Sequence, residues 1–98
     1  MPPQTPNDPY ALALAALAAT LTDERRAERF LALTGIGTDE LRLRASEPAL
    51  LSALIAFLEA HEPDLLSVSE AIGVRADQLV AARRQIEGSQ GDQWARRS

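Results

Sequence analysis

One histidine is the residue of this chain best suited to acid–base or metal chemistry. His61 lies between Glu59 and Glu62, with Asp64 nearby, and such side chains can bind a metal ion or exchange protons. A metal site of this kind usually needs a second imidazole or a His-Glu-x-x-His spacing, and the sequence contains neither. A histidine at the negative end of a helix explains the same residues. We therefore expect no catalytic residue, no metal and no cofactor, in a protein that is not an enzyme.

Arginines in the stretch LSVSEAIGVRADQLVAARRQ, residues 66–85, indicate a second kind of chemistry. A helix, a Gly-Val corner and a second helix with arginines are typical of helix-turn-helix DNA-binding proteins, in which Arg75, Arg83 and Arg84 would contact DNA. From position 65 to 88, however, three carboxylates balance these arginines, and the whole chain has a net charge of −4. That charge repels nucleic acid on average. A DNA-binding regulator is therefore the alternative hypothesis.

The glycine corner of this stretch occurs twice in the chain. GIGTDEL (35–41) and GVRADQL (73–79) match as G-[IV]-x-x-D-x-L at a shift of 38 residues. In each copy, the glycine allows a positive φ, the next aliphatic residue closes the corner, and the aspartate suits the start of the following helix. Packing and capping thus explain every shared position. We expect both corners to form similar helix-turn-helix units.

The elements that carry these residues are predicted to be helices. Apolar residues recur at helical spacing between prolines and glycines, and no window alternates with a period of two. In the first helix, Tyr10, Leu14, Leu17 and Leu21 share one face, which we predict to be core. The expected fold is all-α, a compact bundle of five to six short helices with two helix-Gly-helix corners. The predicted helices are 9–20, 23–34, 38–45, 48–61, 64–72 and 76–87.

A single domain is expected over residues 9–88, between a flexible N-terminal segment (1–8) and a flexible C-terminal tail (89–98). The stretch YALALAALAATL is short, has no basic residues before it and is followed by TDERR, so we expect neither a signal peptide nor a membrane span. The chain has no cysteine, which excludes disulfides and thiolate-bound metals. We expect a cytoplasmic protein that contacts neither nucleic acid nor a membrane.

The helix at 48–61 is apolar over more than half its circumference, and we predict it to be the hub of the fold. Leu50 and Phe57, seven residues apart on its flank, are the expected contacts of a two-fold homodimer. Trp94, the only tryptophan, is a further candidate anchor for a partner. The leading hypothesis is therefore a non-enzymatic helical protein-interaction module that self-associates.

The chain also resembles a known family from about Tyr10 to Gly88. The likeness is most specific in RFLALTGIGTDELR (29–42) and EAIGVRADQLVAARR (70–84). The family consists of small bacterial helical proteins, common in alphaproteobacteria, and is catalogued as a domain of unknown function. The resemblance implies an all-helical fold and supplies no catalytic or binding residues. The chain differs from the family at Arg75-Ala76, where a stronger capping residue or a proline would be expected.

Overall fold

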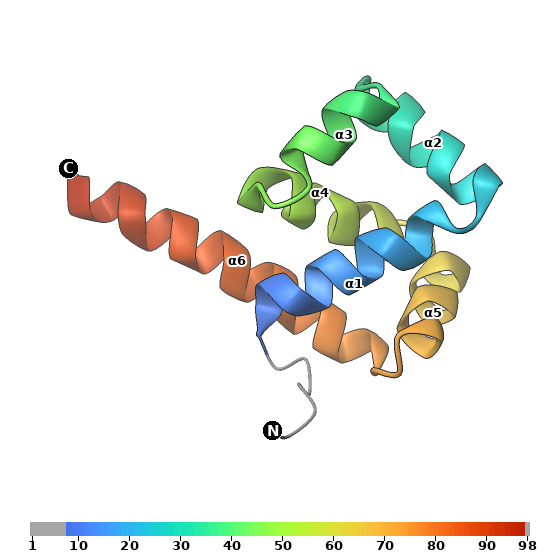
Figure 1. Ribbon diagram of the computed structural model, residues 1–98. Coiled ribbons are helices and arrows are strands. Elements are labelled where there is room, and N and C mark those ends of the chain that lie inside the picture. Colours follow the sequence, from blue (N-terminus) through green and yellow to red (C-terminus); the bar gives the residue numbers. More distant parts are fainter. Residues whose placement is uncertain (1–7, 98) are drawn as a thin grey trace, which may run out of the picture.

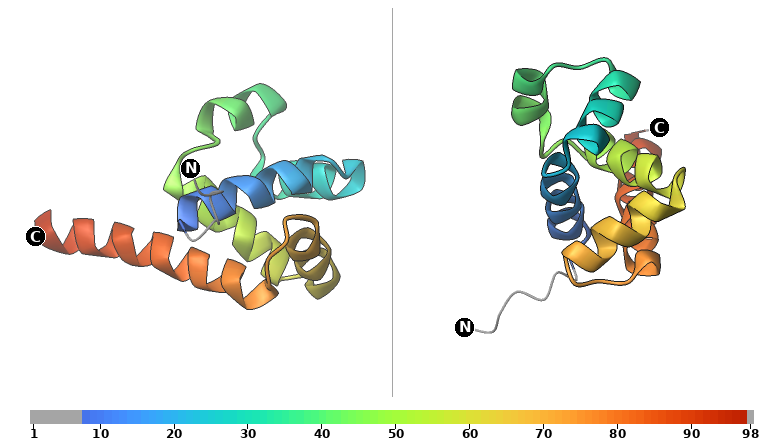
Figure 2. Two further views of the ribbon diagram at one scale, coloured as in Figure 1. Left: turned by 60° about the horizontal axis from the view of Figure 1, so that its bottom comes forward. Right: turned by 90° about the vertical axis from the view of Figure 1, so that its right-hand side faces the viewer.

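The computed structural model describes the backbone of residues 8–97 and the side chains of residues 8–88. Six helices form one compact bundle (Figure 1), and no strand occurs over this range, so the predicted all-α fold is confirmed. α1 and α4 lie in the middle, with α6 on one side and α2–α3 on the other (Figure 2). The helices are α1 (Pro9–Leu21), α2 (Glu24–Thr34), α3 (Thr38–Arg44), α4 (Pro48–Glu59), α5 (Glu62–Ala71) and α6 (Ala76–Arg97).

Prolines and aspartates determine where several helices begin. α1, α4 and α5 each have a proline in the first turn, where its fixed φ is suitable and its missing N–H is not needed. Asp8 accepts a hydrogen bond from the backbone N–H of Tyr10 at 3.3 Å, and Asp23 accepts one from that of Arg26 at 3.0 Å. These carboxylates satisfy N–H groups that have no partner inside the helix.

Both glycine corners have the left-handed backbone that the sequence predicts. Gly35 ends α2 with φ 72°, and Gly73 lies between α5 and α6 with φ 76°. The N–H of Gly35 donates to the carbonyl of Leu31 at 2.8 Å, and the N–H of Val74 donates to that of Ser69 at 2.9 Å. An L residue with a Cβ rarely adopts this conformation, which explains why glycine stands at both corners.

The repeat extends beyond the corners, because the chain consists of two similar three-helix units. α2 and α5 begin 38 residues apart, at Glu24 and Glu62, and so do α3 and α6. Buried positions follow the same shift, as with Leu41 in α3 and Leu79 in α6. The units differ in their last helix, which has 7 residues in α3 and 22 in α6.

The central position of α4 is as predicted. Its leucines and its isoleucine are buried against α1, α5 and α6. Phe30 of α2 completes this core, and its ring centroid lies 5.3 Å from that of Phe57. The buried residues of α4 are Leu50, Leu51, Ser52, Leu54, Ile55 and Leu58.

The predicted end of the last helix at Glu87 is wrong, since α6 continues to Arg97. Gly88 and Gly91 weaken a helix by only about 1 kcal/mol each relative to alanine, and no proline follows to stop it. The side chains of residues 89–98, Trp94 among them, lie outside the described residues, as do residues 1–7. None of the helices in the described part of the chain combines the length and apolar character that a membrane crossing requires.

Candidate functional site

An ion-pair cluster joins α2 to α5 next to His61. Asp64 of α5 is the one charged residue among those described that is buried, with a side chain 8% exposed. Its carboxylate accepts hydrogen bonds from the Nε–H of Arg26, at 3.0 Å, and from the guanidinium of Arg29. Burial raises the pKa of Asp64, but the hydrogen bonds from Arg29 and Arg26 outweigh it and hold the pKa below its usual range. The Asp64 carboxylate therefore stays ionised and connects α5 to α2 through its two arginine partners.

His61 is exposed and precedes α5, at the rim of an open depression of about 670 Å³. The depression is bounded by residues of both charge signs, including Arg25 and Glu28, so it favours neither anions nor cations. Over residues 8–88, no group of three His, Asp or Glu side chains is placed to hold a metal ion. The contacts of the charged residues around the depression serve to connect α2 with α5.

The two α4 residues predicted to contact a partner are used within the chain itself. Leu50 is only 8% exposed and belongs to the core, so its assignment to an interaction surface is wrong. Phe57 is partly buried, because it packs on Phe30 and the guanidinium carbon of Arg29 lies 5.6 Å from its ring centroid. The wide apolar surface of α4 is covered by neighbouring helices, which the sequence pattern alone could not distinguish from coverage by a second chain.

A second polar network joins α4 to α6. Arg83 of α6 donates to Glu59 of α4 and, at 2.8 Å, to Glu87. Its hydrogen bonds with Glu59, and then with Glu87, raise the pKa of Arg83. Ser52 also donates to Glu87, and the bonds from Ser52 and Arg83 lower the pKa of that carboxyl. This network fastens the first half of α6 to the body of the protein.

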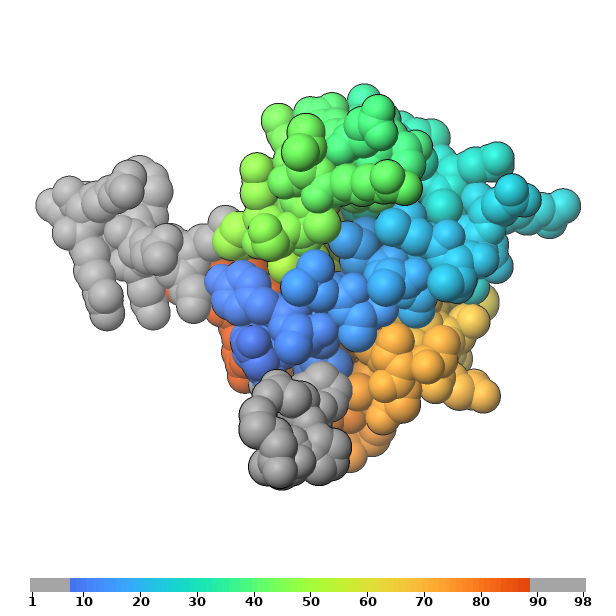
Figure 3. All heavy atoms as spheres, viewed as in Figure 1, coloured from blue at the N-terminus to red at the C-terminus, as the bar shows by residue number. Residues whose placement is uncertain are grey.

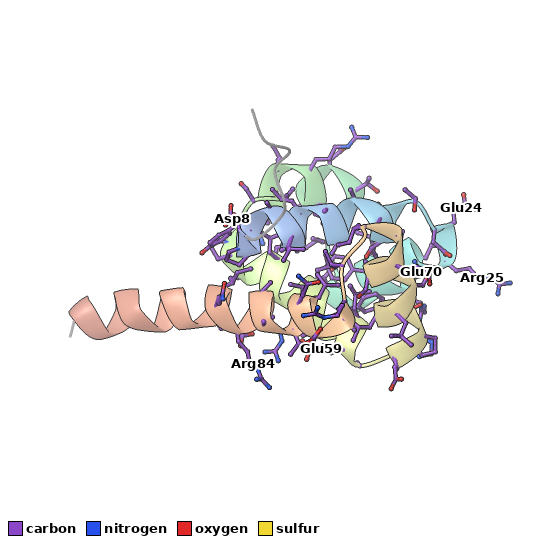
Figure 4. All side chains as sticks on the ribbon, turned by 90° about the horizontal axis from the view of Figure 1, so that it is seen from below. Asp8, Glu24, Arg25, Glu59, Glu70 and Arg84 are labelled. Carbon is purple, nitrogen blue, oxygen red and sulfur yellow. The ribbon has the colours of Figure 1, made fainter. Side chains whose placement is uncertain are left out.

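The network around Arg83 includes one of the three arginines predicted to contact DNA. Arg83 is engaged inside the fold and cannot reach DNA without breaking its bonds to Glu59. Arg75 pairs with Asp77 at 3.0 Å on the exposed start of α6. Arg84 is exposed and points away from the body (Figure 4). The corner thus offers one arginine pointing outward and one beside a carboxylate, a weaker cationic surface than the sequence indicated.

The feature that the sequence did not predict is an uncovered face on α1. Leu14 and Leu21 are 40% and 41% exposed, and Ala18 between them is exposed as well. The three residues lie on one side of the helix, and we call them the α1 face. No charged residue occurs in the 14 positions from Pro9 to Thr22. α1 crosses the middle of the molecular surface between α3 and α5 (Figure 3).

The predicted core stripe of α1 is thus wrong for Leu14 and Leu21, and within it only Leu17 is fully buried. α1 packs instead through a neighbouring face rich in small side chains, and alanine lets α4 and α6 approach its backbone closely. The sequence does contain a pattern that indicates this buried face: Ala13, Ala16 and Thr20 recur at i, i+3 and i+7. All three are buried.

Comparisons with known proteins supply a family and no function. No curated protein and no solved structure matches the chain. The family described as "Protein of unknown function (DUF3572)" matches residues 6–89, which confirms the resemblance seen in the sequence, whereas the bacterial source it suggested stays a prediction. Because this match covers nearly the whole chain, the protein belongs to that family.

Proposed function

We propose that this protein is a non-enzymatic, helical protein-interaction module whose docking surface is the α1 face. The observation that carries this proposal is the pair of leucines exposed on one side of an uncharged helix, Leu14 and Leu21. Single exposed leucines are ordinary on protein surfaces. Two on the same face, with alanine between them, offer a partner helix a continuous apolar strip.

The energetics favour a partner for this strip. Complete burial of a leucine side chain stabilises by about 1.5–3 kcal/mol, so covering the exposed two-fifths of Leu14 and of Leu21 contributes about 1 kcal/mol each. No charged side chain of α1 loses its hydration when the strip is covered, because α1 carries none. Binding at the α1 face therefore has a favourable apolar term and little electrostatic cost.

The polar clusters support the same proposal, because their groups already serve the fold. Asp64 is held by Arg26 and Arg29, and Arg83 is held by Glu59. Such contacts orient helices, so the charged groups of the two clusters are committed to the fold. The alternative of a DNA-binding regulator draws on the corner at residues 66–85, where the engagement of one arginine leaves it with less support than the α1 face has.

Photo-cross-linking in the source cells tests the proposal. A benzophenone amino acid replaces Leu14 in the full chain, and in a matched variant it replaces Leu43 of α3, which is even more exposed at 84%. We expect a discrete adduct from position 14 that is lost on adding Leu21→Glu, and no such adduct from position 43. The absence of an adduct at position 14, or identical adducts at both positions, would contradict the proposal.

A further inference from the structure

The second unit of the chain shows what kind of element fits the α1 face. At the shift of 38 residues, all five buried residues of α1 align with buried residues of α4. α4 has a sixth buried residue, Ser52, and it aligns with Leu14, which is exposed. By the same shift, the half-buried Glu59 aligns with Leu21. The two helices therefore differ in whether this one side is covered.

On α4 the covering element is α6. Ser52 donates to Glu87, and Glu59 accepts from Arg83, so a helix lies along the side of α4 that corresponds to the α1 face. In the first unit the corresponding helix is α3, which ends after 7 residues and makes no extensive contact with another helix. The α1 face is thus the side of the helix that lacks the covering helix its counterpart has.

We propose that a second copy of this chain supplies the missing helix, with the two α1 helices packed antiparallel across a two-fold axis near Ala18. This inference rests on the proposed function and names its partner. Such an axis places Leu14 of one copy beside Leu21 of the other, and Ala18 beside Ala18, so the strip is complementary to itself. Because α1 is uncharged, no like charges meet, and the antiparallel arrangement brings opposite helix ends together.

A second copy is the occupant that this chain's own surface favours. Among the helices whose side chains are described, α1 alone exposes two large apolar residues. Leu33, Leu43 and Leu66 are exposed singly, on α2, α3 and α5. A second α1 face is an uncharged, apolar complement to the first. One helix pair is a small interface, so the dimer is weak and forms only at high protein concentration.

Sedimentation equilibrium of the full chain, from about 10 to about 500 µM, tests the inference. We expect a monomer–dimer equilibrium whose dissociation constant rises at least about tenfold in Leu21→Glu, because the symmetric interface contains that residue twice. Leu66→Glu is the matched control: Leu66 is 50% exposed on α5, and its substitution leaves the equilibrium unchanged. Circular dichroism checks that both variants keep their helical content.

Two results overturn the inference. One is a monomer over the whole concentration range. The other is a dimer whose dissociation constant changes equally in Leu21→Glu and Leu66→Glu. The proposed function fails separately, by the cross-linking result. Suppose that position 14 forms an adduct with a protein other than this chain and that the mass is strictly monomeric. The proposal of an interaction module would then stand, and the inference that its partner is a second copy would fail.

Discussion

Replacing Gly73 with alanine tests the left-handed corner that joins α5 to α6. Gly73 has φ 76°, and a Cβ added there would meet no other atom within 4 Å. Steric crowding by the rest of the protein is therefore absent, and only the backbone cost of a left-handed L residue is left. That cost is about 1–2 kcal/mol, so Gly73→Ala should lower the free energy of unfolding by about that amount.

Gly88→Ala is the matched control, because it makes the same chemical change in a different backbone conformation. A Cβ at Gly88 also meets nothing within 4 Å, but this residue lies inside α6. Alanine is the better helix former, so the free energy of unfolding should rise by up to about 1 kcal/mol. If the helix instead ended at Glu87, Gly88 would be its left-handed cap, and the same substitution would destabilise the protein.

Urea denaturation followed by far-ultraviolet circular dichroism measures both variants. If the slope against denaturant is unchanged, the two midpoints should move in opposite directions. The free energies of unfolding of the two variants should then differ by about 2 kcal/mol. In thermal melts, each kcal/mol corresponds to a shift of about 4–8 °C for a domain of this size. A neutral or stabilising Gly73→Ala would refute the corner, and a destabilising Gly88→Ala would refute the extent of α6.

Three further outcomes are expected. Leu54→Ala, at a fully buried position of α4, should cost about 2–5 kcal/mol of unfolding free energy in the same urea assay, and a cost under 1 kcal/mol would contradict the central place of α4. Asp64→Asn should cost about 2 kcal/mol at pH 7, because it removes the charged acceptor of Arg26 and Arg29. Since the folded state lowers the pKa of Asp64, its stabilisation is present above the unfolded value near 4 and is lost as the pH falls through the folded value. Wild type should therefore lose more stability than Asp64→Asn between about pH 5 and pH 2, and equal losses would show that the ion pair adds nothing. Binding to mixed-sequence duplex DNA should be weaker than about 10 µM at physiological salt, measured by fluorescence anisotropy, and tight salt-sensitive binding would restore the DNA hypothesis.

Local signals explain why most of the fold was predictable. Proline and aspartate before an apolar run define a helix start, and a glycine followed by an aliphatic residue defines a corner, so the order of six helices followed from the sequence. The end of α6 did not follow, because the glycines at 88 and 91 are weak stop signals where no proline is present. A cost of about 1 kcal/mol for each glycine is too small to fix a boundary from sequence alone.

The candidate site was harder to predict because it depends on which helices meet. The spacing of Leu14, Leu17 and Leu21 defines a face of α1 and does not say whether a neighbour covers it. Contacts between distant parts of the chain decide that matter: α6 lies along the matching side of α4, whereas the short α3 makes no extensive contact with another helix. The pairing of Arg26 with Asp64 is likewise long-range, so neither residue carries a local sign of it.

Oxidative cross-linking at Ala18 tests most directly whether two α1 faces meet. The chain contains no cysteine, so Ala18→Cys places a single thiol next to the proposed two-fold axis, where two copies come close enough for a disulfide. Ala53→Cys, on an exposed position of α4, is the control for random collision. Under mild oxidation at about 100 µM protein, Ala18→Cys should form a covalent dimer well before Ala53→Cys does. Equal rates for the two variants, or a faster reaction at Ala53→Cys, would contradict the account.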